Sequence, residues 1–554
     1  MPRVHQVLLT LVCVFRFASC VQALGNYTFW DEISAQQTFE HQSSDQQTSR
    51  HRTLHFETFQ HKSFEHVFWY HFLKHKTLHH QNLKQDNLGH QPSGDQKLEP
   101  KTLGDEISGQ QNSRQKKATG CTAEPLLPAK PFFVVWNHPT ASCRADGIDL
   151  GFDKWGIIDN NHDSFIGEEI VLFYKLGQIP RYSGNTPYYG GIPQLGNLSN
   201  HLQQVNLDIN NNIPSPAFSG LSVIDFESWR PLFNLNFDTL KIYKDKSIEL
   251  AKHKFPLYNQ SQILQEATKE FEQAARSFLE TTLQRASVAR PGGRWGYYGY
   301  PRCWDTYCNT STVAINNQLS WIYNISTGLY PSIYFLRGES RASRATRIHN
   351  IIHETLRVKA TWSSQDAVIL PYSLCQDNSF DLFNTTDLSY SIMEPADMGS
   401  SGIILWGSSN YMQAKNECLI LRDYINTTLG PFVQNVTSFF ANCSLQLCEG
   451  HGRCVRTDYE QYYQQYLKKR GDSSCLIPDD VLARKNTKLR EKPNKSHANY
   501  IFRYHREKST HHSGMNPSIL MDDQRDLQLS DFDDYVCKCF AGWSGTHCEH
   551  PATK

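Results

Sequence analysis

From about residue 125 onward, short runs of apolar and β-branched residues alternate with longer amphipathic stretches. The apolar runs predict strands at residues 132–136, 221–225, 295–298, 332–334, 367–370 and 402–406. Between them, Leu264, Ala267, Phe271, Ala274 and Phe278 recur at intervals of three and four, which predicts a long helix. Such alternation is typical of βα units around a parallel sheet. About 320 residues of it favour an α/β fold with a β/α (TIM-like) barrel over an open sheet, although periodicity alone does not prove closure.

Two acidic residues follow the apolar run at 221–224. On an extended strand, residues two apart face the same side, so Asp225 and Glu227 would point together while Phe226 points away. Two neighbouring carboxyl groups resist ionising together, which raises the proton affinity of one of them and supplies a general acid. An isolated Asp-x-Glu is more often a helix N-terminus or a solvated acidic pair. The apolar run directly before this pair favours a hydrolytic active site.

Aromatic residues end other predicted strands. Tyr298, Tyr334 and Trp406 occupy the carboxyl ends of three of them, which is the edge where barrel enzymes build their active sites. Aromatic faces stack on the C–H surfaces of sugars, and a phenol can also donate a hydrogen bond. Each of these residues alone is more commonly part of a core. Their joint position predicts a carbohydrate-binding cleft.

The first 118 residues have a different pattern. Arg3 and His5 precede an apolar stretch and small residues up to Ala23, which predicts a secretory signal peptide at residues 1–23. His, Gln, Lys and Ser dominate most of residues 24–118, which hold too little apolar surface to offset the entropy of ordering them. The basic cluster at 114–117 leads to the hypothesis of a propeptide. The histidines share no ligand spacing, so a metal site is the weaker alternative and we predict none.

Composition narrows the class of protein. Fifteen cysteines and many glycosylation sequons indicate a secreted, extracellular protein. The 55 basic residues balance the 55 acidic ones, which excludes a globally basic nucleic-acid-binding protein. No run of 18 apolar residues follows the N-terminus, so we expect no membrane span. The sequons are at Asn26, Asn197, Asn259, Asn309, Asn324, Asn384, Asn426, Asn435, Asn442 and Asn494.

Four segments together resemble the animal hyaluronidases, a family that includes sperm, lysosomal and venom enzymes. They are VIDFESWRP at 223–231, WGYYGYP at 295–301, LYPSIY at 329–334 and ILWGSS at 404–409. The likeness runs from about Lys130 to the C-terminus and leaves out residues 24–118. It implies a distorted β/α barrel at 119–438. The reaction it implies is endo-hydrolysis, with retention, of the β-1,4 bond between N-acetylglucosamine and glucuronic acid in hyaluronan.

The resemblance also implies roles for individual residues. In this family the 2-acetamido oxygen of the substrate, and no carboxylate, attacks the anomeric carbon. Glu227 then matches the proton donor, and Asp225 matches the residue that orients the acetamide. The residues that match substrate contacts are Tyr298, Tyr334, Trp406 and, as a weaker match, Tyr174. We expect a monomer that needs no cofactor, with chondroitin as a second candidate substrate. The alternatives are a chondroitin-preferring hydrolase and a catalytically silent glycosaminoglycan-binding or adhesion protein, against which the intact acid pair argues.

A polyanionic substrate needs cations nearby. Arg302 follows Pro301 where some relatives carry an acid, which can alter the preference of a subsite. Arg341, Arg344 and Arg347 recur on successive turns of a predicted helix and are further candidates. A solvated basic face is the commoner outcome of such a pattern.

The cysteines near the C-terminus resemble an EGF-like module at 439–554 that contains a long, loosely packed insertion at 455–536. Spacing alone leaves fifteen pairings for six cysteines, and a zinc site lacks the usual Cys-x2-Cys pairs. The resemblance implies the disulfides Cys143–Cys418, Cys303–Cys308, Cys443–Cys454, Cys448–Cys537 and Cys539–Cys548. Cys121, Cys375 and Cys475 are left over, so at least one of them is free or intermolecular.

Overall fold

The computed structural model describes residues 122–303, 306–336, 338–364, 366–376, 381–408, 414–460, 464, 468, 482 and 532–552. These residues belong to one of two compact units of the chain. The expected signal peptide, the segment 24–118 and most of the insertion at 455–536 lie outside the described residues, as do Cys121, Cys475, Asn26 and Asn494. Within the described part, no helix combines the length and the apolar character needed to cross a membrane.

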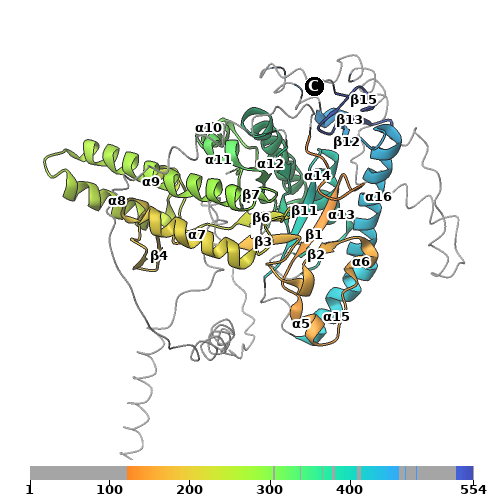
Figure 1. The fold of residues 1–554 in the computed structure, drawn as a ribbon, viewed down its shortest axis with the longest axis horizontal. Helices are drawn as coiled ribbons and strands as arrows, with labels where there is room; N and C mark the ends of the chain where they lie inside the picture. The colour runs from red at the N-terminus through yellow and green to blue at the C-terminus, as the bar shows by residue number, and fades with distance from the viewer. Residues whose placement is uncertain are drawn as a thin grey trace, which may run out of the picture. The chain divides into compact units, whose positions relative to one another are not determined.

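Parallel strands form the centre of this unit (Figure 1). One sheet has the order β10 (Tyr372–Ser373), β11 (Gly402–Trp406), β1 (Phe133–Asn137), β2 (Ile158–Asp159). A second has the order β3 (Ile170–Phe173), β6 (Leu221–Ile224), β7 (Arg294–Tyr297), and a third pairs β8 (Gly328–Leu329) with β9 (Val368–Ile369). All of these pairings are parallel.

Shorter contacts connect the three sheets. Tyr298 forms a parallel bridge to Tyr330, and Ser332 forms one to Tyr372. At the remaining gap, the Asn160 side chain takes the place of a backbone partner: its Nδ2 donates to the carbonyl of Ile170 at 2.7 Å, and its Oδ1 accepts from the amide of Ile170 at 3.1 Å. With β9 and β10 counted as successive parts of one segment, each parallel strand is therefore joined to the next one in chain order, and β11 is joined back to β1.

The strands face two separate apolar clusters. Phe133 and Val135 of β1 belong to one cluster, which also takes in residues of β3, β6, β9, β10 and β11. Val134 and Trp136, the alternate residues of the same strand, belong to the larger cluster formed with the helices. Because both faces of β1 are buried, its sequence is a continuous apolar run and does not alternate with polar residues.

The helices flank the strands (Figure 1). They are α5 (Ala141–Ala145), α6 (Phe152–Trp155), α7 (Leu198–Asn212), α8 (Lys241–Lys254), α9 (Gln260–Ala289), α10 (Thr310–Gln318), α11 (Ser320–Ile325), α12 (Arg341–Trp362), α13 (Thr385–Leu388), α14 (Glu394–Asp397), α15 (Lys415–Tyr424) and α16 (Gly430–Leu447). The hairpin β4 (Arg181–Ser183) and β5 (Thr186–Tyr188) lies between β3 and α7 in the chain. Figure 1 shows α7, α8 and α9 side by side, and α9 packs on both of the others.

The predicted long helix is present as α9, but its buried face differs in part from the prediction. Ala267, Phe271 and Phe278 are buried as expected. Leu264 is 45% exposed, and its neighbour Ile263 is buried instead. Ala274 is only partly buried, and its neighbour Ala275 is buried instead. The prediction was wrong at Leu264 because Ile263 and Leu264 are both apolar, and the spacing of three and four fits either residue as the first member of the stripe.

The strand predictions were partly right. The runs at 132–136, 221–225, 295–298 and 402–406 correspond to β1, β6, β7 and β11, and the run at 367–370 shortens to β9. Residues 332–334 do not form a strand: Ser332 makes only an isolated bridge. Pro331, which has no N–H to donate, precedes it, and the strand β8 lies earlier at Gly328–Leu329. The prediction also omitted β3, whose four residues are all buried.

The C-terminal cysteines lie around two short antiparallel pairs, β12 (Gly452–Arg456) with β13 (Tyr535–Cys539) and β14 (Trp543–Ser544) with β15 (His550–Pro551). Three disulfides hold this part together: Cys443–Cys454, Cys448–Cys537 and Cys539–Cys548. Cys143–Cys418 joins α5 to α15, and Cys303–Cys308 closes a short loop. Cys375 is buried and carries a free thiol. The expected boundary between residues 438 and 439 falls inside α16.

Candidate active site

The two acids lie directly after β6, in unequal surroundings. The Asp225 amide donates to the carbonyl of Phe173 at 3.0 Å, which continues the ladder between β3 and β6 by one residue. Its carboxyl Oδ1 is buried and has no hydrogen-bond partner among the described residues. The Glu227 side chain is 29% exposed. Phe226 packs edge to face on buried Trp229, with ring centroids 4.8 Å apart, and so turns toward the larger cluster.

The buried position of Asp225 raises the proton affinity of its carboxyl group. Burial raises the pKa of Asp225 well above its ordinary value, and the charge of Glu227 raises it further. The positive charge of Arg302 acts in the opposite direction. One acid is therefore shielded and hard to ionise, while its neighbour is reached from solvent.

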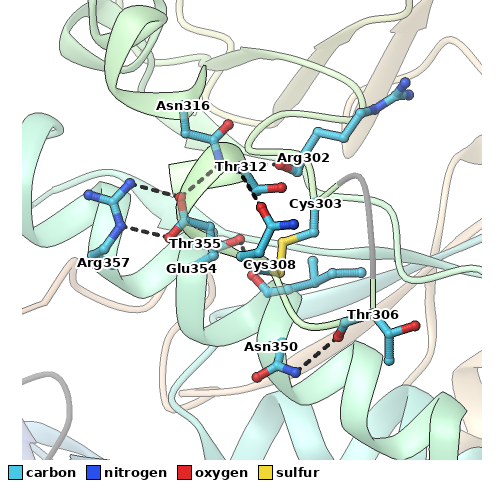
Figure 2. The surroundings of a disulfide bond; sticks show 12 residues. Arg302, Cys303, Thr306, Cys308, Thr312, Asn316, Asn350, Glu354, Thr355 and Arg357 are labelled. Atoms are coloured by element: carbon cyan, nitrogen blue, oxygen red, sulfur yellow. Dashed lines mark hydrogen bonds and ion pairs between the residues drawn. A yellow bond between two sulfur atoms is a disulfide. The ribbon is translucent and has the colours of Figure 1, made fainter. Parts of the chain in front are cut away.

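Arg302 stands beside the exposed acid. Its Nη2 lies 3.7 Å from Oε1 of Glu227, and its own side chain is 23% exposed. The loop that carries it is closed by Cys303–Cys308 and tied to α10, because Asn316 Nδ2 donates to the carbonyl of Arg302 at 3.1 Å (Figure 2). The disulfide and this hydrogen bond therefore fix the position of the loop that carries the Arg302 guanidinium.

The structure brings the predicted aromatic residues into a continuous row. Tyr298 and Tyr334 have ring centroids 6.2 Å apart, and Tyr334 stacks on Trp406 at 6.1 Å. Trp406 Nε1 donates to the Tyr174 hydroxyl at 2.9 Å. Tyr298 directly follows β7, Tyr174 directly follows β3 and Trp406 ends β11. Tyr334 lies in the segment after β8, so the row crosses the carboxyl edge of the parallel strands.

The Tyr298 phenol acts as a neutral group. Burial raises its pKa, and the negative charges of Glu227 and Asp225 raise it further, while a hydrogen bond to Ser332 acts in the opposite direction. The hydroxyl donates to Ser332 Oγ at 3.3 Å. A phenol that keeps its proton next to two acids can donate a hydrogen bond to a substrate oxygen.

Two of the predicted arginines of α12, Arg344 and Arg347, do not serve the site as free cations and do not form a solvated basic face, whereas Arg341, at the first position of the helix, is exposed. Arg344 pairs with Asp387 at 2.6 Å and lies over the ring of Phe335. Arg347 pairs with Glu339 at 2.8 Å, and its Nη2 donates to the carbonyl of Tyr334 at 2.6 Å. Both charges are neutralised internally, and Arg347 holds the backbone of the aromatic row.

Two further residues at this edge were missed in the sequence. Asn137 ends β1 in register with Trp406, and both polar atoms of its buried amide lack partners among the described residues. Tyr372 packs edge to face on Tyr298 at 5.1 Å, and its buried hydroxyl is likewise unpartnered in that part of the chain. The strand-end position of Asn137 was a usable signal, whereas the strand that carries Tyr372 is too short to show a period. Among the residues described, no group of His, Cys, Asp and Glu side chains could hold a metal ion.

Comparison with known proteins identifies the family. The family model for hyaluronidase matches residues 121–511. The chain belongs to the hyaluronidase family. It is accordingly an enzyme, a glycoside hydrolase.

Similar proteins match this chain over most of their own length. Hyaluronidase conohyal-P1 of Conus purpurascens is 40% identical over 336 residues, which are 60% of this chain and 72% of the relative. Hyaluronidase-1 of Homo sapiens is 36% identical over 442 residues, 77% of this chain and 93% of the relative. The hyaluronidase of Crotalus adamanteus is 32% identical over 455 residues, 78% of this chain and 93% of the relative.

Solved structures of bee venom hyaluronidase are also similar. One has 35% sequence identity and a TM-score of 0.52, and covers 55% of this chain and 99% of its own. Another, of that enzyme in complex with a hyaluronic acid tetramer, has 34% identity, a TM-score of 0.53 and the same coverage. The similarity in fold therefore spans nearly the whole of the venom enzyme.

Proposed function

We propose that this hyaluronidase is a secreted endo-β-N-acetylhexosaminidase that hydrolyses the β-1,4 bonds between N-acetylglucosamine and glucuronate in hyaluronan, with retention. The observation that carries the proposal is the unequal acid pair, buried Asp225 and accessible Glu227, beside a row of aromatic side chains. The bee venom enzyme in complex with a hyaluronic acid tetramer supports hyaluronan as the polymer.

The scaffold in this proposal is a distorted β/α barrel of residues 119–438. Strand pairing in chain order, the bridges between sheets and the Asn160 link support closure, and the separate apolar cluster on the inner face of the strands supports a packed interior. Residues 439–554 would form an EGF-like module, which the three disulfides and the antiparallel strands support.

In this proposal the signal peptide at 1–23 would direct export of the protein. The propeptide at 24–118 would then be removed. The exposed sequons would carry glycans.

Glu227 would act first as the general acid. Its partial exposure lets it reach the glycosidic oxygen of a bound chain and protonate it as the bond to the anomeric carbon breaks. The acetamido oxygen of the same N-acetylglucosamine attacks that carbon from the opposite face. Glu227, now ionised, then takes a proton from a water molecule that attacks the anomeric carbon. Two inversions at one carbon give net retention.

Asp225 would orient the acetamide and stabilise the charge that grows on it. An acetamide that attacks through its oxygen becomes positive at nitrogen, and a nearby carboxylate stabilises that charge more strongly in the transition state than in the ground state. The buried Oδ1, which lacks a partner within the described chain, is suited to accept the acetamide N–H. The neutral Tyr298 phenol would contact the same group, while Tyr334 and Trp406 would form the wall of the sugar pocket.

Two variants test this assignment. Glu227→Gln removes the transferable proton while keeping the shape of the side chain, so hyaluronan chain length measured by gel or turbidity should stay constant. Glu249→Gln is the control, because Glu249 is exposed on α8 and pairs with Lys246 on the same helix. Mass spectrometry of the wild-type products should give saturated, even-numbered oligosaccharides with N-acetylglucosamine at the reducing end. Unsaturated uronate ends would indicate a lyase, and full activity of Glu227→Gln would remove the acid from the mechanism.

A further inference from the structure

Arg302 is held close to the proposed proton donor at an open position. The 3.7 Å between its Nη2 and Oε1 of Glu227 is longer than a direct hydrogen bond, and both side chains are partly exposed. A cation in this place lies beside the acid that would protonate the leaving oxygen. Its charge also lowers the pKa of Asp225 against the effect of burial.

The backbone of Arg302 is fixed by a buried polar network (Figure 2). Asn316 donates to the Arg302 carbonyl and to Oε1 of Glu354 at 2.8 Å, and its own Oδ1 accepts from the Tyr323 hydroxyl at 2.9 Å. Arg357 holds Glu354 through two contacts of 2.6 and 2.7 Å. Figure 2 shows the Arg302 side chain extending away from this network and from the disulfide. The side chains of this network form hydrogen bonds with one another, and the Arg302 guanidinium extends away from them.

The chemistry of the scissile unit places an anion near this guanidinium. The leaving oxygen is carried by C4 of the uronate, and the adjacent C5 carries the carboxylate. Glu227 has to come within hydrogen-bond distance of the leaving oxygen to protonate it. A group 3.7 Å from the Glu227 carboxyl can therefore reach the carboxylate on the next carbon. Guanidinium and carboxylate match in geometry and can form two parallel hydrogen bonds.

Protonation of Glu227 favours an interaction of Arg302 with the substrate carboxylate over its interaction with Glu227. Glu227 must be neutral to donate its proton, and a neutral carboxyl no longer attracts the guanidinium as an anion does. The uronate carboxylate can then take the place of the Glu227 carboxylate beside Arg302.

We propose that Arg302 binds the carboxylate of the uronate on the leaving-group side of the scissile bond and is a specificity-determining residue of this enzyme. The inference rests on the proposed function and deepens it. Arg302 selects for an acidic sugar next to the bond that is cut, and it aligns the leaving oxygen with Glu227.

The test compares hyaluronan with hyaluronan whose carboxylates are methyl-esterified. Arg302→Gln should lower kcat/KM on native hyaluronan about 10- to 100-fold, the effect of losing a hydrogen bond to a charged group. On the ester it should change kcat/KM by less than about twofold, because no carboxylate remains to be bound. Arg302→Lys keeps the charge without the planar fork and should fall between wild type and Arg302→Gln on the native polymer. Arg422→Gln, an exposed arginine on α15 paired with Asp423, is the matched control.

Each outcome decides one of the two proposals. An equal loss on both polymers, or a shifted pH–rate profile with unchanged discrimination, would mean that Arg302 acts on Glu227 alone and would overturn the inference. Absence of cleavage by the wild-type protein would instead remove the proposed function. If Arg302→Gln fails to fold, as judged by circular dichroism, the ratio of native to esterified activity for Arg302→Lys answers the same question: the ratio falls if Arg302 binds the carboxylate and is unchanged if it does not.

Discussion

At the scale of single residues, ionisation of the buried Asp225 carboxyl lowers the stability of the folded protein. The group is shielded from solvent, its Oδ1 lacks a partner among the described residues, and the neighbouring Glu227 repels its negative charge. Burial therefore raises the pKa of Asp225 in the folded state above its value in the unfolded chain. The folded state binds this proton more tightly, so stability falls as pH rises between the two pKa values.

Asp225→Asn should make the protein more stable at neutral pH while removing its activity. Below the unfolded pKa, near 4, aspartic acid and asparagine are both neutral and the Tm values should be close. As pH rises toward and through the raised pKa, the Tm of the variant should exceed that of the wild type by a growing margin. Thermal unfolding from pH 4 to 8 measures this. Asp423→Asn, at a 70% exposed side chain, should show no such trend, and a lower Tm for Asp225→Asn at pH 7 would contradict the argument.

In the proposed site, Tyr174 would act on the wall of the sugar pocket through its hydrogen bond with Trp406. Its hydroxyl accepts the indole N–H at 2.9 Å and so fixes the plane of the indole against Tyr334. Tyr174→Phe should raise KM about two- to tenfold, the effect of one neutral hydrogen bond, and change kcat by less than about twofold. Steady-state kinetics on hyaluronan oligosaccharides separates the two constants. Tyr189→Phe, an exposed tyrosine beside Arg181, is the control, and a fall in kcat alone would place Tyr174 in the chemical step.

At the scale of elements, several sequons also begin helices. Asn197, Asn259, Asn309 and Asn384 are the N-caps of α7, α9, α10 and α13, and the side chain of each accepts a backbone N–H of the first turn. The cap uses Oδ1, whereas a glycan is attached through Nδ2. One side chain can therefore cap a helix and carry a glycan together.

Variants of the sequon at Asn259 separate these two roles. Asn259 and Gln262 form a reciprocal capping box at the start of α9, each side chain accepting the other's backbone N–H at 3.0 Å. Asn259→Ala removes glycan and cap and should lower the stability of the protein by about 1 kcal/mol. Ser261→Ala removes only the sequon, and Asn259→Asp removes the glycan but keeps a capping oxygen. Chemical denaturation with mass analysis checks this. If Ser261→Ala is as destabilising as Asn259→Ala, the glycan and not the cap carries the effect.

The elements also mark the limit of what the sequence pattern can predict. The runs that became β1, β6, β7 and β11 are apolar on both faces and stand out, and the acid pair was recognisable because it follows such a run. β8, β9 and β10 have two residues each, too few to display a period, and their pairing depends on neighbours that are distant in the chain. The roles of Arg344 and Arg347 were equally hidden, because Asp387 and Glu339 approach them only in the folded chain.

At the scale of the whole described unit, the cysteine-rich C-terminal part is built into the strands and is not a separate attachment. Tyr535 on β13 donates to buried Asp397, the last residue of α14 and close ahead of β11, at 2.6 Å. Thr122, ahead of the first strand, bridges to Phe540. These contacts lie near the amino ends of the parallel strands, at the opposite edge from the acid pair. Loss of this part should therefore unfold the catalytic part without altering the chemistry of the site directly.

Arg453 is the residue on which this prediction can be tested without truncation. It is 2% exposed on β12, and its guanidinium donates to the carbonyls of Pro131 at 3.0 Å and Gly399 at 3.2 Å, just before β1 and β11. Burial lowers the pKa of Arg453 to about 10, so it stays charged at neutral pH. Arg453→Met keeps much of the apolar volume but leaves buried carbonyls without a donor, which should cost about 3 kcal/mol of stability.

Denaturant unfolding measures the stability of the variant, and steady-state kinetics measures its activity per folded molecule. Stability should fall, and kcat and KM at a temperature where the variant is folded should match the wild type, because Arg453 lies at the edge of the strands away from Glu227. Arg422→Met, at an exposed position of α15, should leave both quantities unchanged. An altered kcat in folded Arg453→Met would mean that the C-terminal part is coupled to the carboxyl edge of the strands, and a stable Arg453→Met would mean that the disulfides alone hold the two parts together.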